Sequence, residues 1–439
     1  PERSTEENKQ VILRAMKWLG LTWDEGPEVG GDFGPYLQTE RFDTYTEALE
    51  RLKERDAVYP CFCTKEELDA KRAAAEKSEG GYSGYDRTCR NLDKAEAQRR
   101  IDAGEPHVWR LKVPENHGPI EFKDAVYGDM SFPADVMDDM ILVRTDGTPT
   151  YNFAVVCDDA NMQITHVIRG DDHLSNTPRQ ILIYEALGYE VPIFAHLSMI
   201  LGADGRKLSK RRNATSVEQY QAMGFLPDAL VNFLALLGWS LDGETTIIPR
   251  EVLCKEFSLD RITRKDAIFD EMKLDWMNGE YIKAMDFDKF YERALPYLKE
   301  VLKKDFDLRK IAGMVQTRIE VFPDIPDLVD FFEEVPEYDS AMYRHKKMKT
   351  TEETSLAVLK EVLPVLEAQE DYTNDPLYAS LSAFVKEHGY KNGYVMWPLR
   401  TAVSGKQMTP AGATEIMEII GKDETLKRVH AAIEKLERE

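Results

Sequence analysis

The sequence predicts an α/β fold, in which an interrupted α/β domain carries an α+β insertion and is followed by an all-α region. Strand and helix patterns alternate between residues 151 and 209, which is typical of a parallel sheet covered by helices. Residues 42–150 mix short strand patterns with charged helical runs. Beyond about residue 286 apolar residues recur every three to four positions, which predicts helices almost throughout.

The chain opens on a pattern that predicts an amphipathic helix. Ser4 and Glu7 form a capping box, and Gly20 supplies a stop. The apolar face of this helix consists of Val11, Ile12, Ala15, Met16 and Leu19. Residues 24–36 contain six glycine and proline residues, so we expect a loop there, and neither a dinucleotide fingerprint nor a phosphate-loop lysine accompanies it.

Two helices and two strands are expected in the insertion. The helices cover residues 42–55 and 64–77, with a cysteine-containing turn between them, and the strands lie around Val108–Val113 and Asp139–Arg144.

The alternating region begins with the strand candidates Tyr151–Val156, Ile164–Ile168 and Ile193–Ile200. Thr177-Pro178 starts a helix that Gly188 ends. A polar turn at 202–210 leads into helices at Ser216–Met223, where Ser216 and Gln219 form a capping box, and at Pro227–Leu237. The later helices show apolar spacing at Leu298, Val301, Leu302, Leu356, Leu359, Leu363 and Leu366.

Composition limits the function classes. With 439 residues the chain is long enough for about three domains, and no apolar run is long enough to cross a bilayer. No secretory signal is visible, so we expect a cytoplasmic protein. In that reducing compartment the five cysteines are expected to be free thiols or metal ligands rather than disulfides. The 57 basic and 79 acidic residues give a net charge of -22, so nucleic acid would have to bind through local basic patches.

The sharpest chemical feature is the run Lys207-Leu208-Ser209-Lys210-Arg211-Arg212. These cations follow an apolar strand and a Gly-Ala-Asp-Gly corner, and such a cluster at the carboxyl edge of an α/β sheet suits a polyphosphate. From charge alone, a solvated basic loop is the simpler interpretation.

This run resembles the KMSKS motif of class I aminoacyl-tRNA synthetases, in the KLSKR form of the glutamyl and glutaminyl members. Further segments look like signatures of the glutamyl-tRNA synthetases, and they cover nearly the whole chain. They are residues 34–41, 151–156, 158–159, 164–173, 176–180, 214–217, 397–400 and 403–405. The helical C-terminal half resembles the bacterial type, which implies a Rossmann-like catalytic domain and an α-helical anticodon-binding region.

The resemblance implies ATP-dependent activation of L-glutamate to an adenylate and its transfer to the 3′ end of tRNA(Glu). Lys207 and Lys210 would be catalytic, Mg²⁺ would bind through the phosphates, and residues 207–211 (Lys207, Leu208, Ser209, Lys210 and Arg211) would contact ATP. Tyr151, Val155 and Arg169 would form the glutamate pocket, because a guanidinium fork suits a carboxylate. Without the resemblance, Arg169 reads as a salt-bridged strand end and Tyr151 as a packing residue.

Two clusters are candidate metal sites. Cys61, Cys63 and Cys89, with Tyr85, could hold Zn²⁺ tetrahedrally, and some family members resemble this set. Plain buried thiols are the equal alternative. The cluster Asp171-Asp172-His173 could also bind a metal, but a structural turn is the preferred interpretation.

For RNA, the basic segments are residues 206–212, 261–265 and 344–349. The last of these could equally be an exposed helix end. Arg318 is a candidate anticodon reader by its rough position in the family. We expect a monomer with no membrane association.

The chain departs from the family pattern in two places. The HIGH motif and the acidic segment after it are absent, so we expect an N-terminal truncation and an inactive chain as given. Arg212-Asn213 stand where His-Gly is usual, which puts the mobility of the loop in question.

The resemblance predicts six parts: catalytic domain 1–44, acceptor-end insertion 45–150, catalytic domain 151–210, stem-contact region 211–286, and helical subdomains 287–345 and 346–439. Two alternatives stay open: a glutaminyl or non-discriminating synthetase, and a non-catalytic tRNA-binding paralogue.

Overall fold

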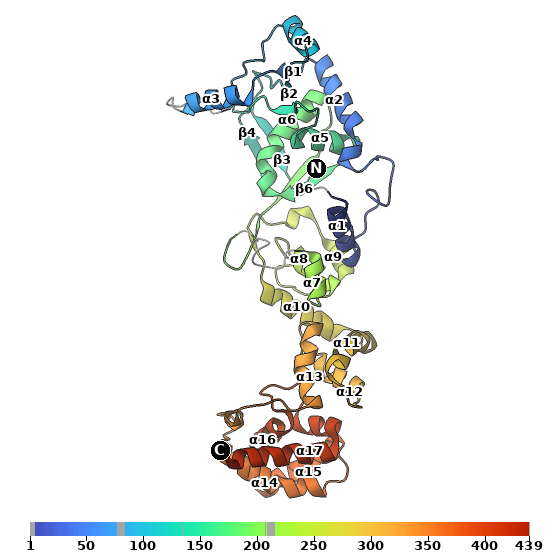
Figure 1. Cartoon of the computed structure of the whole chain (residues 1–439), viewed down its shortest axis with the longest axis vertical. Helices are drawn as coiled ribbons and strands as arrows, with labels where there is room; N and C mark the ends of the chain where they lie inside the picture. The colour runs from blue at the N-terminus through green and yellow to red at the C-terminus, as the bar shows by residue number, and fades with distance from the viewer. Residues whose placement is uncertain (1–4, 77–83, 135, 207, 209–215, 439) are drawn as a thin grey trace. The chain divides into compact units, whose positions relative to one another are not determined.

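The computed structural model describes residues 5–76, 84–134, 136–206, 208 and 216–438, in two compact units (Figure 1). The α/β unit comprises Gly20–Leu208 and Ala235–Phe269. The helical unit comprises Pro1–Leu19, Ser209–Leu234 and Asp270–Glu439.

A parallel strand pair lies at the centre of the α/β unit. Strands β6 (His166–Gly170) and β7 (Ile193–Leu197) pair in parallel, and helix α6 (Thr177–Leu187) connects them. As predicted, α6 has proline in its first turn and ends at Gly188, whose φ of 68° is the left-handed conformation that glycine adopts without strain. A second parallel pair joins β8 (Ile200–Leu201) to β9 (Ala267–Ile268).

The first predicted strand of this region is wrong. Residues Tyr151–Asn161 form helix α5, preceded by Thr150 as its N-cap. Its buried residues, Phe153, Ala154, Val156 and Cys157, recur at helical spacing and face the core. A short apolar run fits a buried helix as well as a strand, so periodicity alone could not decide between them.

The insertion contains a mixed α+β arrangement, as expected. Helix α2 (Phe42–Glu54) precedes an antiparallel sheet of order β1-β2-β5, formed by Val58–Cys61, Val108–Leu111 and Ile141–Val143. The hairpin of β3 (Ile120–Asp124) and β4 (Gly128–Phe132) was not predicted. It joins the central strands, because the Ala125 amide donates to the Phe194 carbonyl at 2.8 Å. The remaining elements of this unit are η1 (Gln38–Glu40), α3 (Lys65–Glu76), α4 (Lys94–Asp102), η2 (Asp171–Asn176), α9 (Arg250–Glu256) and η3 (Leu259–Arg261).

The helical unit begins with α1 (Glu6–Trp18), where two details differ from expectation. Thr5 is the N-cap, since its hydroxyl accepts from the Asn8 amide at 3.2 Å, and Ser4 lies outside the described residues. Leu13 is buried, whereas Ile12 is 62% exposed. The expected capping box at Ser216 and Gln219 is confirmed at α7.

Twelve further elements complete the helical unit. They are α7 (Val217–Ala222), α8 (Pro227–Ala235), α10 (Glu271–Ala284), α11 (Phe287–Val301), α12 (Leu308–Val315), η4 (Phe322–Asp324), α13 (Ile325–Glu333), η5 (Ser340–Tyr343), α14 (Glu352–Ala368), α15 (Asn374–Glu387), α16 (Asn392–Ser404) and α17 (Ala413–Arg438).

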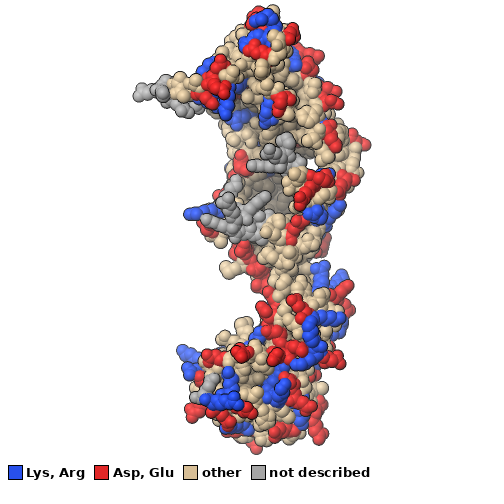
Figure 2. Space-filling view, in the orientation of Figure 1, with Lys and Arg blue, Asp and Glu red and all other residues tan. Residues whose placement is uncertain are grey.

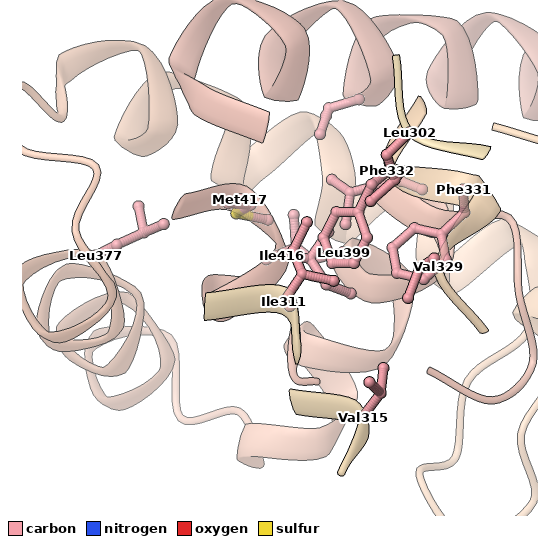
Figure 3. Packing of buried hydrophobic residues seen from close by; sticks show 14 of the residues in the cluster. Leu302, Ile311, Val315, Val329, Phe331, Phe332, Leu377, Leu399, Ile416 and Met417 are labelled. Carbon is pink, nitrogen blue, oxygen red and sulfur yellow. The ribbon is translucent and has the colours of Figure 1, made fainter. Parts of the chain in front are cut away.

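One hydrophobic cluster runs through these helices, from Leu226 to Leu436. Figure 3 shows part of it, including the Phe331 and Phe332 rings, whose centroids lie 4.3 Å apart. The predicted apolar spacing is confirmed, because Leu298, Leu359 and Leu366 are fully buried. All-helical packing of this kind arises when apolar faces recur every three to four residues.

The surface carries both signs of charge. On the face shown in Figure 2, basic and acidic side chains are interspersed, which fits the expectation that RNA contacts depend on local patches. Within the described ranges, no helix is long and apolar enough to cross a membrane.

Candidate functional site

Arg169 lies near the carboxyl end of β6 and directly opposite His196 on β7. Its Nε donates to His196 Nε2 at 3.2 Å, and its Nη2 donates to the Thr177 hydroxyl at 2.8 Å. Burial lowers the pKa of the half-buried guanidinium, and the nearby Tyr151 hydroxyl opposes that shift. Among the described residues no carboxylate forms an ion pair with it, so a salt-bridged strand end is not what the structure contains.

Behind Arg169 lies a buried acid–histidine pair. His196 Nδ1 and Asp124 Oδ2 lie 2.6 Å apart, and both side chains are fully buried. Asp124 Oδ1 also accepts from the backbone amides of Val126 at 2.9 Å and Tyr127 at 2.8 Å. Desolvation lowers the pKa of His196, although Asp124 acts in the opposite direction. Arg169 Nε–H donates to Nε2, which therefore presents a lone pair.

The other predicted pocket residues lie on α5. Tyr151 is half exposed at the start of this helix, and its hydroxyl lies 3.4 Å from His173 Nδ1. Val155 is half-buried one turn later and packs against the core of the α/β unit. The Tyr151 hydroxyl and the Arg169 guanidinium are thus close enough to interact, as a shared pocket requires.

The segment Asp171-Asp172-His173 forms part of the 3-10 helix η2. The Tyr127 hydroxyl donates to Asp171 at 2.9 Å. Within the described part of the chain, these three side chains do not gather as a group of metal ligands, and the expected structural turn is confirmed.

A second buried guanidinium fixes the glycine- and proline-rich loop. Arg41 donates to Asp158 at 2.6 Å, to the Pro35 carbonyl at 2.6 Å and to Asn161 at 2.8 Å. The loop is therefore tied to helix α5, which carries Tyr151. Asp159, the neighbour of Asp158, is half-buried, and burial raises its pKa to about 6.

The basic loop can be described only at its base. Gly202 donates to the Arg206 carbonyl at 2.7 Å, and Gly205 has a φ of 69°, so a tight turn follows β8. Of the predicted ATP contacts, Leu208 is half-buried. The others, Lys207, Ser209, Lys210 and Arg211, lie outside the described residues, as do Arg212 and Asn213.

The four predicted zinc ligands come together. Tyr85 Oη lies 3.2 Å from Cys61 Sγ and 3.8 Å from Cys63 Sγ, and the sulfur atoms of Cys63 and Cys89 lie 3.6 Å apart. The three sulfur atoms lie within 4.8 Å of one another. Hydrogen bonds from Cys89, Tyr85 and Arg110 lower the pKa of Cys61 against the effect of burial.

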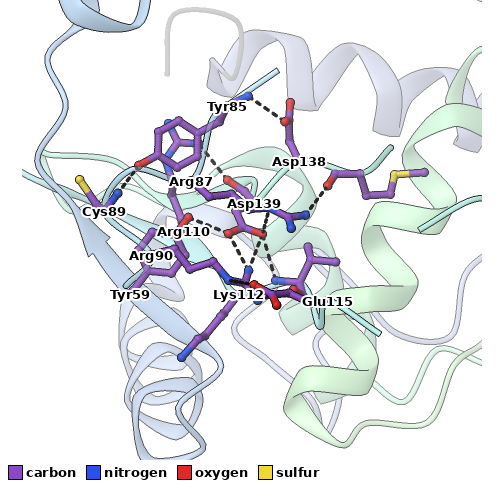
Figure 4. A network of polar contacts seen from close by, with 12 residues as sticks. Tyr59, Tyr85, Arg87, Cys89, Arg90, Arg110, Lys112, Glu115, Asp138 and Asp139 are labelled. Carbon is purple, nitrogen blue, oxygen red and sulfur yellow. Dashed lines mark hydrogen bonds and ion pairs between the residues drawn. The ribbon is translucent and has the colours of Figure 1, made fainter. Parts of the chain in front are cut away.

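A buried polar network supports this cluster (Figure 4). Asp139 accepts from the Tyr59 hydroxyl at 2.8 Å and from Arg90 Nη1 at 2.7 Å. Arg110 lies over the Tyr85 ring, 3.7 Å from its centroid, and its buried Nε has no hydrogen-bond partner among the residues that the structure describes. A cation with a spare N–H beside three thiols is what a bound metal thiolate centre would use, so the residues fit Zn²⁺.

The basic segments have different surroundings. Arg318 is exposed in the turn after α12. Residues 344–349 begin at Arg344, the C-cap of η5, and continue as a tight loop that a bridge between His345 and Thr350 closes. Lys346, Lys347 and Lys349 are exposed there. In segment 261–265, Arg264 has a structural contact, since its Nε donates to the Val126 carbonyl at 2.9 Å.

Sequence reasoning missed the residues that hold Arg169. Asp124 and His196 lie 72 residues apart, and neither belongs to a motif whose spacing signals a pair. Thr177 was recognised only as a helix start. The register of β6 against β7 is the signal that would have placed His196 beside Arg169.

Residues 1–276 match the catalytic domain of class I tRNA synthetases (E and Q), and residues 289–433 match the anticodon binding domain. These matches, with the parallel strands, define a class I synthetase catalytic domain joined to a mostly helical anticodon-binding domain. The predicted fold class is confirmed.

Curated relatives and solved structures narrow the class. The glutamate–tRNA ligase of Clostridium botulinum (strain Hall) is 48% identical over 435 residues, covering 99% of this chain and 89% of the relative. That of Clostridium acetobutylicum is 46% identical, covering 100% and 90%. A glutamate tRNA ligase from Elizabethkingia meningosepticum, solved in complex with its amino acid, superposes with a TM-score of 0.88 at 32% identity, covering 99% and 91%. The chain belongs to the glutamate–tRNA ligase family, whose members are aminoacyl-tRNA ligase enzymes.

Proposed function

We propose that this protein activates L-glutamate with ATP and transfers it to the 3′ end of tRNA(Glu); the inactivity expected of the chain as given stays an untested prediction. The observation that carries the proposal is the half-buried Arg169 guanidinium, which no carboxylate of the described residues neutralises. An incompletely solvated cation favours an anionic ligand, and the planar fork of arginine matches a carboxylate in two parallel hydrogen bonds.

The side-chain carboxylate of glutamate is that ligand. Tyr151 and Val155 lie on one face of α5, one helical turn apart, and supply a polar and an apolar wall beside Arg169. A similar glutamate tRNA ligase was solved in complex with its amino acid, which supports amino-acid binding by this fold. Glutamine carries no charge and would leave the guanidinium without a counter-charge, which favours glutamate.

ATP is bound by the basic loop. Activation requires a glutamate carboxylate to attack the α-phosphate and pyrophosphate to leave, so the protein contributes positioning and charge stabilisation without a covalent nucleophile. Lys207 and Lys210 supply positive charge for the leaving group, and Leu208, Ser209 and Arg211 complete the contacts. Mg²⁺, bound mainly through the phosphates, adds further charge neutralisation.

The tRNA lies along several parts of the chain. We assign 45–150 to the acceptor end, 211–286 to the stem and the helical subdomains 287–345 and 346–439 to the anticodon arm, with 1–44 and 151–210 as the catalytic domain. Arg318 is exposed, as an anticodon reader must be. The exposed lysines of loop 344–349 support contact with the phosphate backbone.

Zn²⁺ would be held by Cys61, Cys63, Cys89 and Tyr85. Four protein ligands leave no open position, so the role of the metal is structural. Bound there, it would fix the end of β1 against the segment that carries Tyr85 and Cys89.

The test is the steady-state kinetics of tRNA charging by the full-length protein carrying Arg169→Gln. We expect the KM for glutamate to rise about a hundredfold or more, with the KM for ATP within about twofold, because a charge-assisted contact with one substrate is lost. The matched control is Arg99→Gln, an exposed arginine of α4 that is paired with Glu96 in its own helix. An unchanged KM for glutamate in the Arg169 variant would reject this site.

Charging of tRNA(Gln) as well as tRNA(Glu) would instead favour a glutaminyl or non-discriminating enzyme. Binding of tRNA by a well-folded full-length protein that charges neither would favour the non-catalytic paralogue.

A further inference from the structure

We propose that Asp124 and His196 are positioning residues that aim the Arg169 guanidinium at the substrate carboxylate. The proposal rests on the glutamate-binding role given to Arg169 above. Three side chains are linked by hydrogen bonds, Asp124 to His196 and His196 to Arg169, from hairpin β3–β4 through β7 to β6.

The tautomer of His196 follows from its partners. Asp124 Oδ2 can only accept, so His196 Nδ1 carries the proton across the 2.6 Å contact. Nε2 is then a lone pair, and Arg169 Nε–H donates to it at 3.2 Å. The Thr177 hydroxyl lies 3.0 Å from the same nitrogen and accepts from Arg169 Nη2, while its own proton points to the His173 carbonyl at 3.5 Å.

This arrangement determines which edge of the guanidinium faces the ligand. Nε–H and one N–H of Nη2 are held by His196 and Thr177. Those two contacts with described residues leave three of the five N–H donors, two of them parallel on the Nη1–Nη2 edge, and the Tyr151 hydroxyl also lies close to the group. That edge offers the bidentate geometry of carboxylate recognition, while the Phe194 ring, 5.3 Å from the guanidinium carbon, lies against the group.

Asp124 is fixed so firmly that its replacement has one predictable outcome. Three backbone amides, those of Val126, Tyr127 and His196, donate to Oδ1. In Asp124→Asn the carbonyl oxygen must keep these donors, so the side-chain amide nitrogen faces His196 Nδ1. His196 then has to accept at Nδ1 and carry its proton on Nε2. The Nε2–H of His196 and the Nε–H of Arg169 would face each other as two donors, which breaks their hydrogen bond.

The experiment measures glutamate charging by the full-length protein with Asp124→Asn. We expect the KM for glutamate to rise about tenfold or more while the KM for ATP changes less than about twofold. In parallel, ¹⁵N chemical shifts of labelled histidine should show His196 change from the Nδ1–H to the Nε2–H form. A merely structural role for Asp124 predicts neither the substrate-selective change nor the tautomer change.

A second pair of variants keeps the test valid if Asp124→Asn does not fold. His196→Gln and His196→Asn both remove the imidazole, but only glutamine reaches far enough to place an acceptor oxygen near Arg169. We expect the asparagine variant to raise the KM for glutamate at least about fivefold more than the glutamine variant. Equal values for the two would overturn the proposal.

The Arg169→Gln variant distinguishes failure of the positioning role from failure of the proposed function. If it raises the KM for glutamate and the Asp124 and His196 variants leave that KM unchanged, the positioning proposal fails and the proposed function stands. If Arg169→Gln itself has no effect, the proposed function fails. If Asp124 and His196 act through the Arg169 guanidinium, adding Asp124→Asn to the Arg169→Gln variant should not raise the KM for glutamate further.

Discussion

Arg428 donates an N–H of Nη1 to the carbonyl oxygen of Phe331 across 2.7 Å, although 97 residues separate the two in the chain. The same nitrogen reaches the Val403 carbonyl at 2.7 Å, and Nη2 reaches that of Phe332 at 2.9 Å. These carbonyls lie near the C-terminal ends of α13 and α16, where intrahelical donors run out. One buried guanidinium therefore caps two helices and joins both to α17.

Arg428→Met should lower the free energy of unfolding by about 2–4 kcal/mol, because three buried carbonyls lose their donors. Thermal unfolding of the full-length protein measures this as a lower Tm. Lys427→Met is the matched control, since this neighbour is 76% exposed and paired with Glu424, and its removal should change the stability by less than about 0.5 kcal/mol. Equal losses in both variants would contradict the capping role.

Asp159 should make stability depend on pH. Burial raises its pKa to about 6, with the charge of Asp158 acting in the same direction. The folded state therefore binds the proton of Asp159 more tightly than the unfolded state does. The stabilisation that this proton provides is lost as the pH rises from about 4 to about 6, so the free energy of unfolding falls over that range.

We expect Asp159→Asn to be more stable than the parent by about 1 kcal/mol at about pH 7, after allowance for solvent screening, and equal to it at about pH 4. Melting curves at both pH values measure the difference. Asp129→Asn, a change of an exposed carboxylate on β4, should show no such trend. A stabilisation that is the same at both pH values would argue against titration as the cause.

Purified full-length protein should contain about one zinc ion per chain, measured by elemental analysis. Cys63→Ser should lose the metal and lower the Tm, because a thiolate ligand is removed. Cys254→Ser changes an exposed cysteine outside the cluster and should retain the metal. Zinc-free protein with all thiols reduced would favour the buried-thiol interpretation.

Lys210→Ala should reduce the rate of adenylate formation by about a hundredfold or more if its charge acts in the transition state. The rate of ATP-dependent glutamyl-adenylate formation is the direct readout. Lys255→Ala, on the exposed face of α9, is the control. A rate equal to that of the parent would refute the role of Lys210.

Arg318→Ala should raise the KM for tRNA about tenfold and leave the KM for glutamate unchanged, because the contact concerns the anticodon arm alone. Arg14→Ala, which removes an exposed arginine of α1 outside the segments assigned to tRNA, should leave both values unchanged. Identical kinetics of the Arg318 variant and the parent would remove this residue from the interface.

Local chemistry explains what could be predicted from the sequence. Helix α6 has both of its ends in the sequence, a threonine–proline start and a glycine stop, and the structure places them as expected. The capping box at Ser216 and Gln219 likewise depends on residues three positions apart. The gathering of Cys61, Cys63, Tyr85 and Cys89 was predicted because two of the cysteines are one residue apart and the other two ligands lie within a short segment.

The errors and omissions involve longer-range determinants. Tyr151–Val156 was assigned to a strand because six residues are too few to separate the two periodicities. Hairpin β3–β4 was missed, and with it Asp124, whose role depends on a strand 72 residues away. Tertiary packing decides such contacts, and no local propensity encodes them.

Asp124 is the last residue of β3, and it therefore belongs to the segment expected to form the acceptor-end insertion. Its carboxylate nevertheless supports a histidine of the central parallel strands. The insertion is thus not a detachable module, because exchanging it between relatives would also exchange the carboxylate that supports His196. Under the proposed roles, tRNA recognition in this segment would evolve under the constraint of amino-acid recognition in the core, and a graft that omits the acid at this position should inherit the new RNA contacts together with a poorly aimed arginine.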